Sequence, residues 1–180
     1  DGFTQLVFCS HPFSWSSSNT GLATRATEGE SFHLVSNSVL ERGPSWDVAC
    51  VRVTERLSLP QVGILDGLPA ASLYFYDGAE CLRSLDQNSK AARRPRGYSC
   101  EELGGLAWGF DDEFPKLRRI SEDFPLFVSP HATGCSRYAS ASFLADGTLA
   151  AAWQQVAADG SQPLVGHSLN AEEVARVLRV

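Results

Sequence analysis

The stretch Ser140-Ala-Ser-Phe-Leu-Ala-Asp-Gly-Thr-Leu-Ala-Ala-Ala-Trp153 decides the fold more than any other part of the chain. Two apolar runs, residues 140–145 and 148–153, flank the dipeptide Asp146-Gly147. Asp-Gly is favoured in tight β-hairpins because their turn positions require positive φ angles. The stretch therefore predicts two antiparallel strands joined at Asp146-Gly147.

A helix is predicted at the end of the chain, after this hairpin. Asn170 is an N-cap residue with Glu173 three positions later, the spacing of a capping box. Apolar residues then recur at helical spacing, and the predicted buried stripe is Ala171, Val174, Val177 and Leu178.

The residues before the hairpin alternate between strand and helix patterns. Apolar runs predict strands at 71–76 and 105–110, and a helix is predicted at 81–92 between them. A second helix is expected to open at Asp111-Asp112 with Pro115 in its first turn. Since both connections are long enough to be crossover helices, the expected fold class is α/β with a mixed sheet.

The first third of the chain predicts a strand, a helix and a strand. Residues 4–9 are a short apolar run, and residues 46–54 read as a buried strand. Thr27 and Glu30 have capping-box spacing, so a helix is expected to follow them and to stop at Gly43-Pro44. We expect residues 1–67 to form an N-terminal extension packed on a core of residues 68–180.

The order of elements resembles the thioredoxin superfamily, specifically its peroxiredoxin-like branch. The matching pieces are residues 73–76, 111–117, 124–127 and 142–147, followed by the closing helix. The resemblance implies a thioredoxin-like mixed sheet with flanking helices.

The chain departs from that family at the redox site. Where the redox members carry Cys-x-x-Cys or Thr-Pro-x-x-Cys, this chain has the single Cys81, and no proline precedes the hairpin in residues 135–139. An alternative register places Pro69 in the cis-proline role, a hairpin at residues 76–81, and the active-site position near Cys9-Ser10-His11.

Cys81 is the candidate catalytic residue. At the start of a helix its thiolate would be stabilised by the helix dipole, with Arg83 as a favourable charge and Glu80 as an unfavourable one. The alternative interpretation is a buried or inert cysteine.

Other chemical motifs are incomplete. Cys9, His11, His131 and Cys135 have the wrong spacing for a zinc site, so no metal is expected. Gly166-His-Ser168 resembles a nucleophile elbow, but no histidine follows it in the chain. No phosphate-binding glycine loop is present, and no cofactor is expected.

Composition narrows the class of protein. The 180 residues carry a net charge of −6, which disfavours nucleic-acid binding, and 43% are hydrophobic, as in globular proteins. No apolar run approaches the roughly 18 residues of a membrane-spanning helix. The chain has no methionine, which suggests a fragment or a processed chain, for example one matured in an organelle.

The function predicted from the sequence is that of a non-catalytic accessory or interaction protein, a subunit of a larger assembly with a protein partner. The alternative is a one-cysteine thiol-redox enzyme that uses Cys81 and Arg83. A third interpretation is a different α+β fold with a site for a small ligand.

Overall fold

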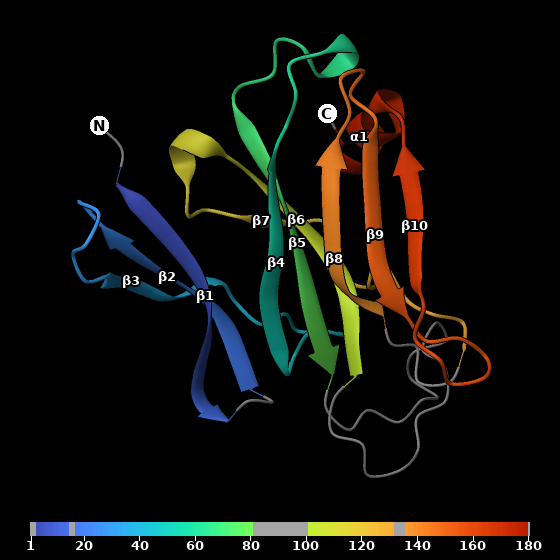
Figure 1. Cartoon of the computed structure of the whole chain (residues 1–180), viewed down its shortest axis with the longest axis horizontal. Coiled ribbons are helices and arrows are strands. Elements are labelled where there is room, and N and C mark those ends of the chain that lie inside the picture. The colour runs from blue at the N-terminus through green and yellow to red at the C-terminus, as the bar shows by residue number, and fades with distance from the viewer. Residues whose placement is uncertain (1–2, 15–16, 81–100, 132–135, 180) are drawn as a thin grey trace.

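The fold consists of two β-sheets and one α-helix (Figure 1). The computed structural model describes residues 3–14, 17–80, 101–131 and 136–179. Its large sheet contains β1 (Thr4–Ser14), β2 (Ser17–Arg25), β3 (His33–Leu40), β4 (Cys50–Ser58), β5 (Ala71–Glu80), β6 (Glu101–Phe110) and β7 (Arg118–Arg119). The small sheet contains β8 (Ser136–Phe143), β9 (Leu149–Gln155) and β10 (Leu164–Leu169). The helices are α1 (Ala171–Leu178) and the 3₁₀ turns η1 (Gly63–Leu65) and η3 (Asp111–Glu113).

The predicted α/β, thioredoxin-like sheet with flanking helices is wrong. The structure is 51% strand and 10% helical, and its described part contains one α-helix. The paired strands are antiparallel except at a single β2–β4 contact, so crossover helices are not required. Residues 81–92, which are predicted from the sequence to form a helix, lie outside the described part of the chain.

Two segments predicted as helices are extended. Residues 33–40 form β3, because β2 offers them an antiparallel partner. The Thr27 amide donates to the Glu30 carboxylate as in a capping box, but the Glu30 amide donates to the Thr27 backbone carbonyl, which closes a turn instead of starting a helix. After η3, the amide of Ile120 donates to the carbonyl of Leu106, so this segment runs along β6 instead of coiling.

Asp77-Gly78 lies inside the continuous strand β5, which contradicts the alternative hairpin predicted at residues 76–81. A Cβ atom on Gly78 would lie 2.5 Å from the Trp46 ring. The glycine therefore makes room for a buried indole. Asp77 points to the opposite face of β5 and accepts a hydrogen bond from the Tyr138 amide at 2.9 Å.

The hairpin and the final helix are confirmed. β8 and β9 pair around the predicted turn, in which Gly147 has a φ of 84°. Asn170 accepts from the Glu173 amide at 2.9 Å, and the Glu173 carboxylate accepts from the Asn170 amide at 2.8 Å. Val174, Ala175 and Leu178 are the buried residues of α1.

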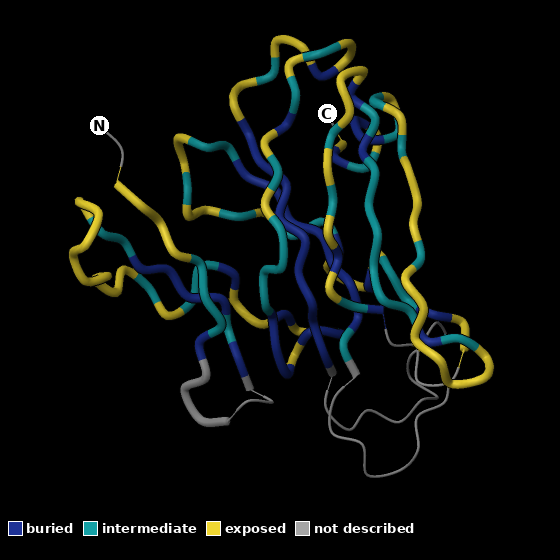
Figure 2. The backbone as a smooth tube through the Cα atoms, in the orientation of Figure 1, coloured by how far each residue is buried: buried dark blue, intermediate teal, exposed yellow. Residues whose placement is uncertain are grey.

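The core lies on both faces of β5 and β6, which are the most continuously buried strands (Figure 2). One face packs against the small sheet and α1 through Leu73, Phe75 and Leu106. The other packs against Trp46, Val51 and Leu40 through Tyr74 and Tyr76. The small sheet therefore faces β5 and β6 of the large sheet, and α1 lies at one end of the space between the two sheets (Figure 1).

Strands β1, β2 and β3 project to the side of this sandwich (Figure 1). β4 pairs with β5 along its whole length, so residues 50–58 share a sheet with the predicted core. The domain boundary predicted after Gly67 stays a prediction.

Candidate functional site

The predicted redox residues fall in a part of the chain that the structure does not describe. Cys81, Arg83 and Cys135 lie outside the described residues. Cys9 is half-buried in β1 and Cys50 is buried at the start of β4. Within the described ranges, no group of three metal-ligating side chains occurs.

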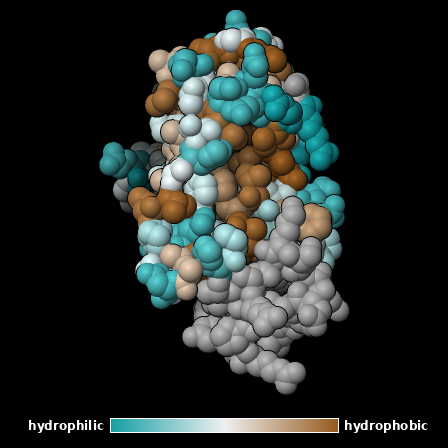
Figure 3. Space-filling view, turned by 90° about the vertical axis from the view of Figure 1, so that its right-hand side faces the viewer, coloured by the Kyte–Doolittle hydropathy of each residue, from teal (hydrophilic) through white to brown (hydrophobic). Residues whose placement is uncertain are grey.

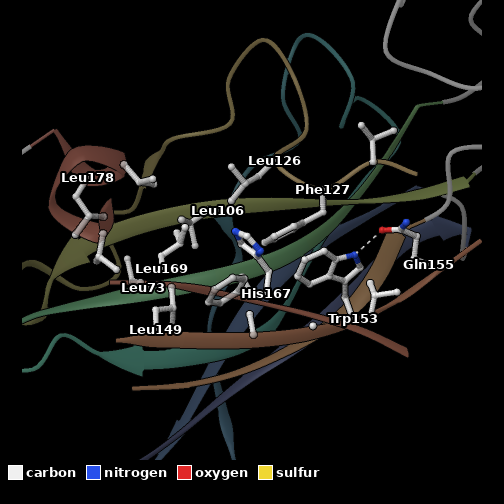
Figure 4. A pocket seen from close by; sticks show the side chains of 17 residues that line it. Leu73, Leu106, Leu126, Phe127, Leu149, Trp153, Gln155, His167, Leu169 and Leu178 are labelled. Atoms are coloured by element: carbon white, nitrogen blue, oxygen red, sulfur yellow. Dashed lines mark hydrogen bonds between the residues drawn. The ribbon is translucent and has the colours of Figure 1, made fainter. Parts of the chain in front are cut away.

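An apolar cavity of about 530 Å³, which we call the inter-sheet cavity, lies between the two sheets. Seventeen residues line it (Figure 4). β5 and β6 contribute Leu73, Phe75 and Leu106. β9 contributes Leu149, Ala151, Trp153 and Gln155, while β10 contributes residues 165–167 and Leu169. Residues 126–128 and the α1 residues Val174, Val177 and Leu178 complete it.

Strand alternation explains why these side chains meet. On β9, residues 149, 151, 153 and 155 face inward, and β10 pairs in register so that Val165 lies opposite Trp153 and Leu169 opposite Leu149. From Leu149 to Gln155 the strand rises about 20 Å. The cavity is therefore elongated along β9.

The opening of the cavity lies between β10 and residues 126–128. His167 is exposed on β10 although it shares the inward-facing register with Val165 and Leu169. Leu126 opposite it is 42% exposed. Figure 3 looks at this side of the molecule, where apolar side chains gather between polar ones. These exposed side chains therefore mark the side on which the cavity meets the solvent.

Two polar side chains, Gln155 and His167, belong to the lining described by the structure. The Trp153 indole nitrogen donates to Oε1 of Gln155 at 3.1 Å, which fixes the plane of the indole (Figure 4). His167 lies midway along the cavity, beside Ala151. A ligand can therefore meet hydrogen-bonding groups at the middle and at the Gln155 end.

A polar cluster of Arg52, Asp77, Glu102 and Arg137 occupies the inter-sheet space beyond Phe75. Glu102 pairs with Arg52 and, at 2.9 Å, with Arg137. Asp77 is 1% exposed and its Oδ2 atom has no hydrogen-bond partner. Burial raises the pKa of Asp77 to about 6, although the Tyr138 amide and the two arginines oppose the shift.

A second buried ionic group lies on the opposite face of the large sheet. Asp47 is fully buried and its Oδ2 atom lies 2.9 Å from Nε of Arg119. The Tyr76 hydroxyl donates to Asp47 at 3.3 Å. Burial raises the pKa of Asp47 more than Arg119 lowers it. Trp46 stacks on Tyr76 and donates to the Ser121 carbonyl at 2.8 Å, so we read this group as structural.

No family model, curated protein or solved structure matches this chain. The peroxiredoxin-like resemblance therefore stays a prediction resting on short stretches of sequence, and the fold it implies is not the one observed. In the part of the chain that is described, no helix is long and apolar enough to cross a membrane.

Sequence reasoning missed the cavity residues. Val165, His167 and Leu169 alternate with small or polar residues, which is the signal of a half-buried strand. That signal was masked by the similarity of residues 166–168 to a nucleophile elbow. The structure places His167 and Ser168 on opposite faces of β10.

Proposed function

We propose that this protein binds a small apolar molecule in the inter-sheet cavity. The observation that carries the proposal is an open cavity of about 530 Å³ whose lining is apolar apart from Gln155 and His167. Ligand pockets are typically concave, mostly apolar and equipped with a few polar groups that orient the ligand. Apolar voids also cost stability, so a binding role gives a reason to keep one.

Binding fits the cavity better than catalysis does. His167 could move a proton, but nucleophilic catalysis needs a serine, cysteine or carboxylate beside such a base. The described lining supplies none of these. We therefore propose a non-catalytic binding role, and action through a protein partner remains a proposal beside it.

The test is a matched pair of substitutions on adjacent residues of β9. Ala151 faces into the cavity, whereas Ala152 faces away from it. Ala151→Phe should fill the cavity and weaken binding of the uncharged fluorescent probe N-phenyl-1-naphthylamine about tenfold or more. Ala152→Phe should leave the affinity within about twofold, because it adds the same ring outside the cavity.

The melting temperature of each variant shows whether it is folded. If Ala151→Phe does not fold, Ala151→Leu adds a smaller group at the same position and should also weaken binding of the probe. Equal binding by the Ala151 and Ala152 variants, or no binding by the unsubstituted protein, would contradict the proposal.

The one-cysteine alternative is tested separately. Cys81 as a redox nucleophile would alkylate rapidly below about pH 7, and Cys81→Ser would abolish that reaction. We expect no such fast reaction, because the chain has no partner cysteine in a Cys-x-x-Cys motif and Glu80 is adjacent to Cys81.

A further inference from the structure

The lining of the inter-sheet cavity is chemically divided along its length, and this division indicates what the ligand is. The inference rests on the proposed function. At the α1 end the walls are aliphatic: Leu73, Leu149, Leu169, Val174, Val177 and Leu178. At the Gln155 end the lining includes the aromatic rings of Phe75, Phe127 and Trp153, beside the aliphatic Val165. Figure 4 shows Leu149 and Leu178 on one side of His167 and Phe127 and Trp153 on the other.

The aromatic end is a connected group of rings. The centroids of Phe127 and Trp153 lie 4.4 Å apart at an interplanar angle of 37°, and those of Phe75 and Phe127 lie 6.1 Å apart at 20°. Flat ring systems gain from such surroundings beyond the burial of area alone, through offset and edge contacts. The hydrogen bond from Trp153 to Gln155 holds the indole in place.

Gln155 supplies a donor at that end. Its Oε1 atom accepts from Trp153, so the two N–H groups of its side-chain nitrogen take no part in that hydrogen bond. An oxygen substituent on a ligand ring would satisfy one of these donors. A purely hydrocarbon ligand would leave the amide without that bond.

The aliphatic end is formed by branched side chains of two sheets and a helix. They present methyl groups from several directions, which suits a chain or an isoprenoid-like group rather than a flat ring. The capping box of α1 fixes the helix over this end. The distance of about 20 Å along β9 accommodates a ring and a tail placed end to end.

We propose that the ligand is an alkyl- or isoprenoid-substituted ring that bears an oxygen. The ring lies against Trp153 and Phe127 with its oxygen near Gln155, and the tail lies beneath α1. His167 contacts the ligand at the opening of the cavity.

The test compares three probes by calorimetry: 4-hexylphenol (ring and tail), 1-dodecanol (tail, with equal carbon count and the same hydroxyl group) and 2-naphthol (ring). The measured quantity is the ratio of the 1-dodecanol and 4-hexylphenol dissociation constants. Trp153→Leu should lower this ratio roughly three- to tenfold, because it removes the ring contact while the tail contacts remain. Trp153→Phe keeps a ring and should preserve the ratio within about twofold.

A substitution at the α1 end of the cavity tests where the tail of the ligand lies. Val177→Phe narrows the tail end, so it should weaken both tailed probes about tenfold while 2-naphthol stays within about twofold. If Trp153→Leu does not fold, Phe127→Leu removes the neighbouring ring and should lower the ratio in the same way.

Three results of these measurements would contradict the proposal, each in a different part. A ratio unchanged by either leucine substitution would overturn the ring assignment while leaving apolar binding intact. Equal loss of all three probes in Val177→Phe would overturn the placement of the tail. No binding of any probe to the unsubstituted protein would overturn the proposed function itself.

Discussion

At the scale of single residues, Asp77 links the two sheets and makes stability depend on pH. Its Oδ1 atom accepts from the Tyr138 amide, and Tyr138 reaches it because its backbone is left-handed, with a φ of 56°, at an irregularity in the β8–β9 pairing. The carboxyl is buried near Arg52 and Arg137, and burial outweighs their opposing charges in raising its pKa to about 6.

We expect Asp77→Asn to flatten the fall in stability with rising pH. Between pH values of about 4 and 6 the folded protein keeps a proton on Asp77 that the unfolded chain releases, so unfolding becomes easier as pH rises. Relative to Asp77→Asn, the unsubstituted protein should lose up to about 3 kcal/mol of unfolding free energy across that window. Urea unfolding at several pH values measures this difference.

Asp66→Asn controls for the loss of one carboxylate, since Asp66 is exposed beside η1. Parallel pH profiles for the unsubstituted protein and Asp77→Asn would show that Asp77 titrates alike in the folded and unfolded states.

At the scale of elements, α1 closes one end of the cavity and should be strongly coupled to the core. Leu178 is 4% exposed and belongs to the main apolar cluster. Leu178→Ala should lower the unfolding free energy by about 2–4 kcal/mol, as truncations do in cores that cannot collapse. Arg176→Ala, on the exposed side of the same helix, should cost below about 0.5 kcal/mol.

Chemical denaturation of both variants measures the two losses of unfolding free energy. Similar small losses for Leu178→Ala and Arg176→Ala would mean that α1 does not stabilise the core and does not seal the cavity.

The elements predicted correctly are those whose signals are local. Asp146-Gly147 and the Asn170–Glu173 capping box specify a turn and a helix start within a few residues. The strand at residues 105–110 was likewise evident from its apolar run.

The errors arose where a distant partner decides the local conformation. Residues 33–40 carry a helix-compatible pattern, yet pairing with β2 makes them a strand. Gly78 resembles a turn glycine but is required by the packing of Trp46, which lies 32 positions earlier in the chain. The cavity was beyond prediction for the same reason: its walls come from two sheets and a helix, and only the register of β9 and β10 aligns them.

At the scale of the whole molecule, the two sheets are held together at both ends of the inter-sheet cavity. α1 packs across one end, and the hydrogen bond from Tyr138 to Asp77 and the ion pair of Arg137 with Glu102 join the sheets at the other. A ligand in the cavity adds contacts to both sheets that the empty protein lacks. It should therefore stabilise the sandwich as a unit.

We expect 4-hexylphenol at 100 times its dissociation constant to raise the unfolding free energy by about 2.7 kcal/mol, because it binds the folded state alone. Ala151→Phe should lose this stabilisation and Ala152→Phe should keep it, as measured by urea unfolding with and without the probe.

The side strands offer a competing explanation, since Phe3 and Leu34 are 61% and 59% exposed and could adsorb an apolar compound. Stabilisation that persists undiminished in Ala151→Phe would place the compound on those strands. Stabilisation lost in Ala151→Phe alone would place it between the sheets, because the two substitutions differ only in the face of β9 on which the ring lies.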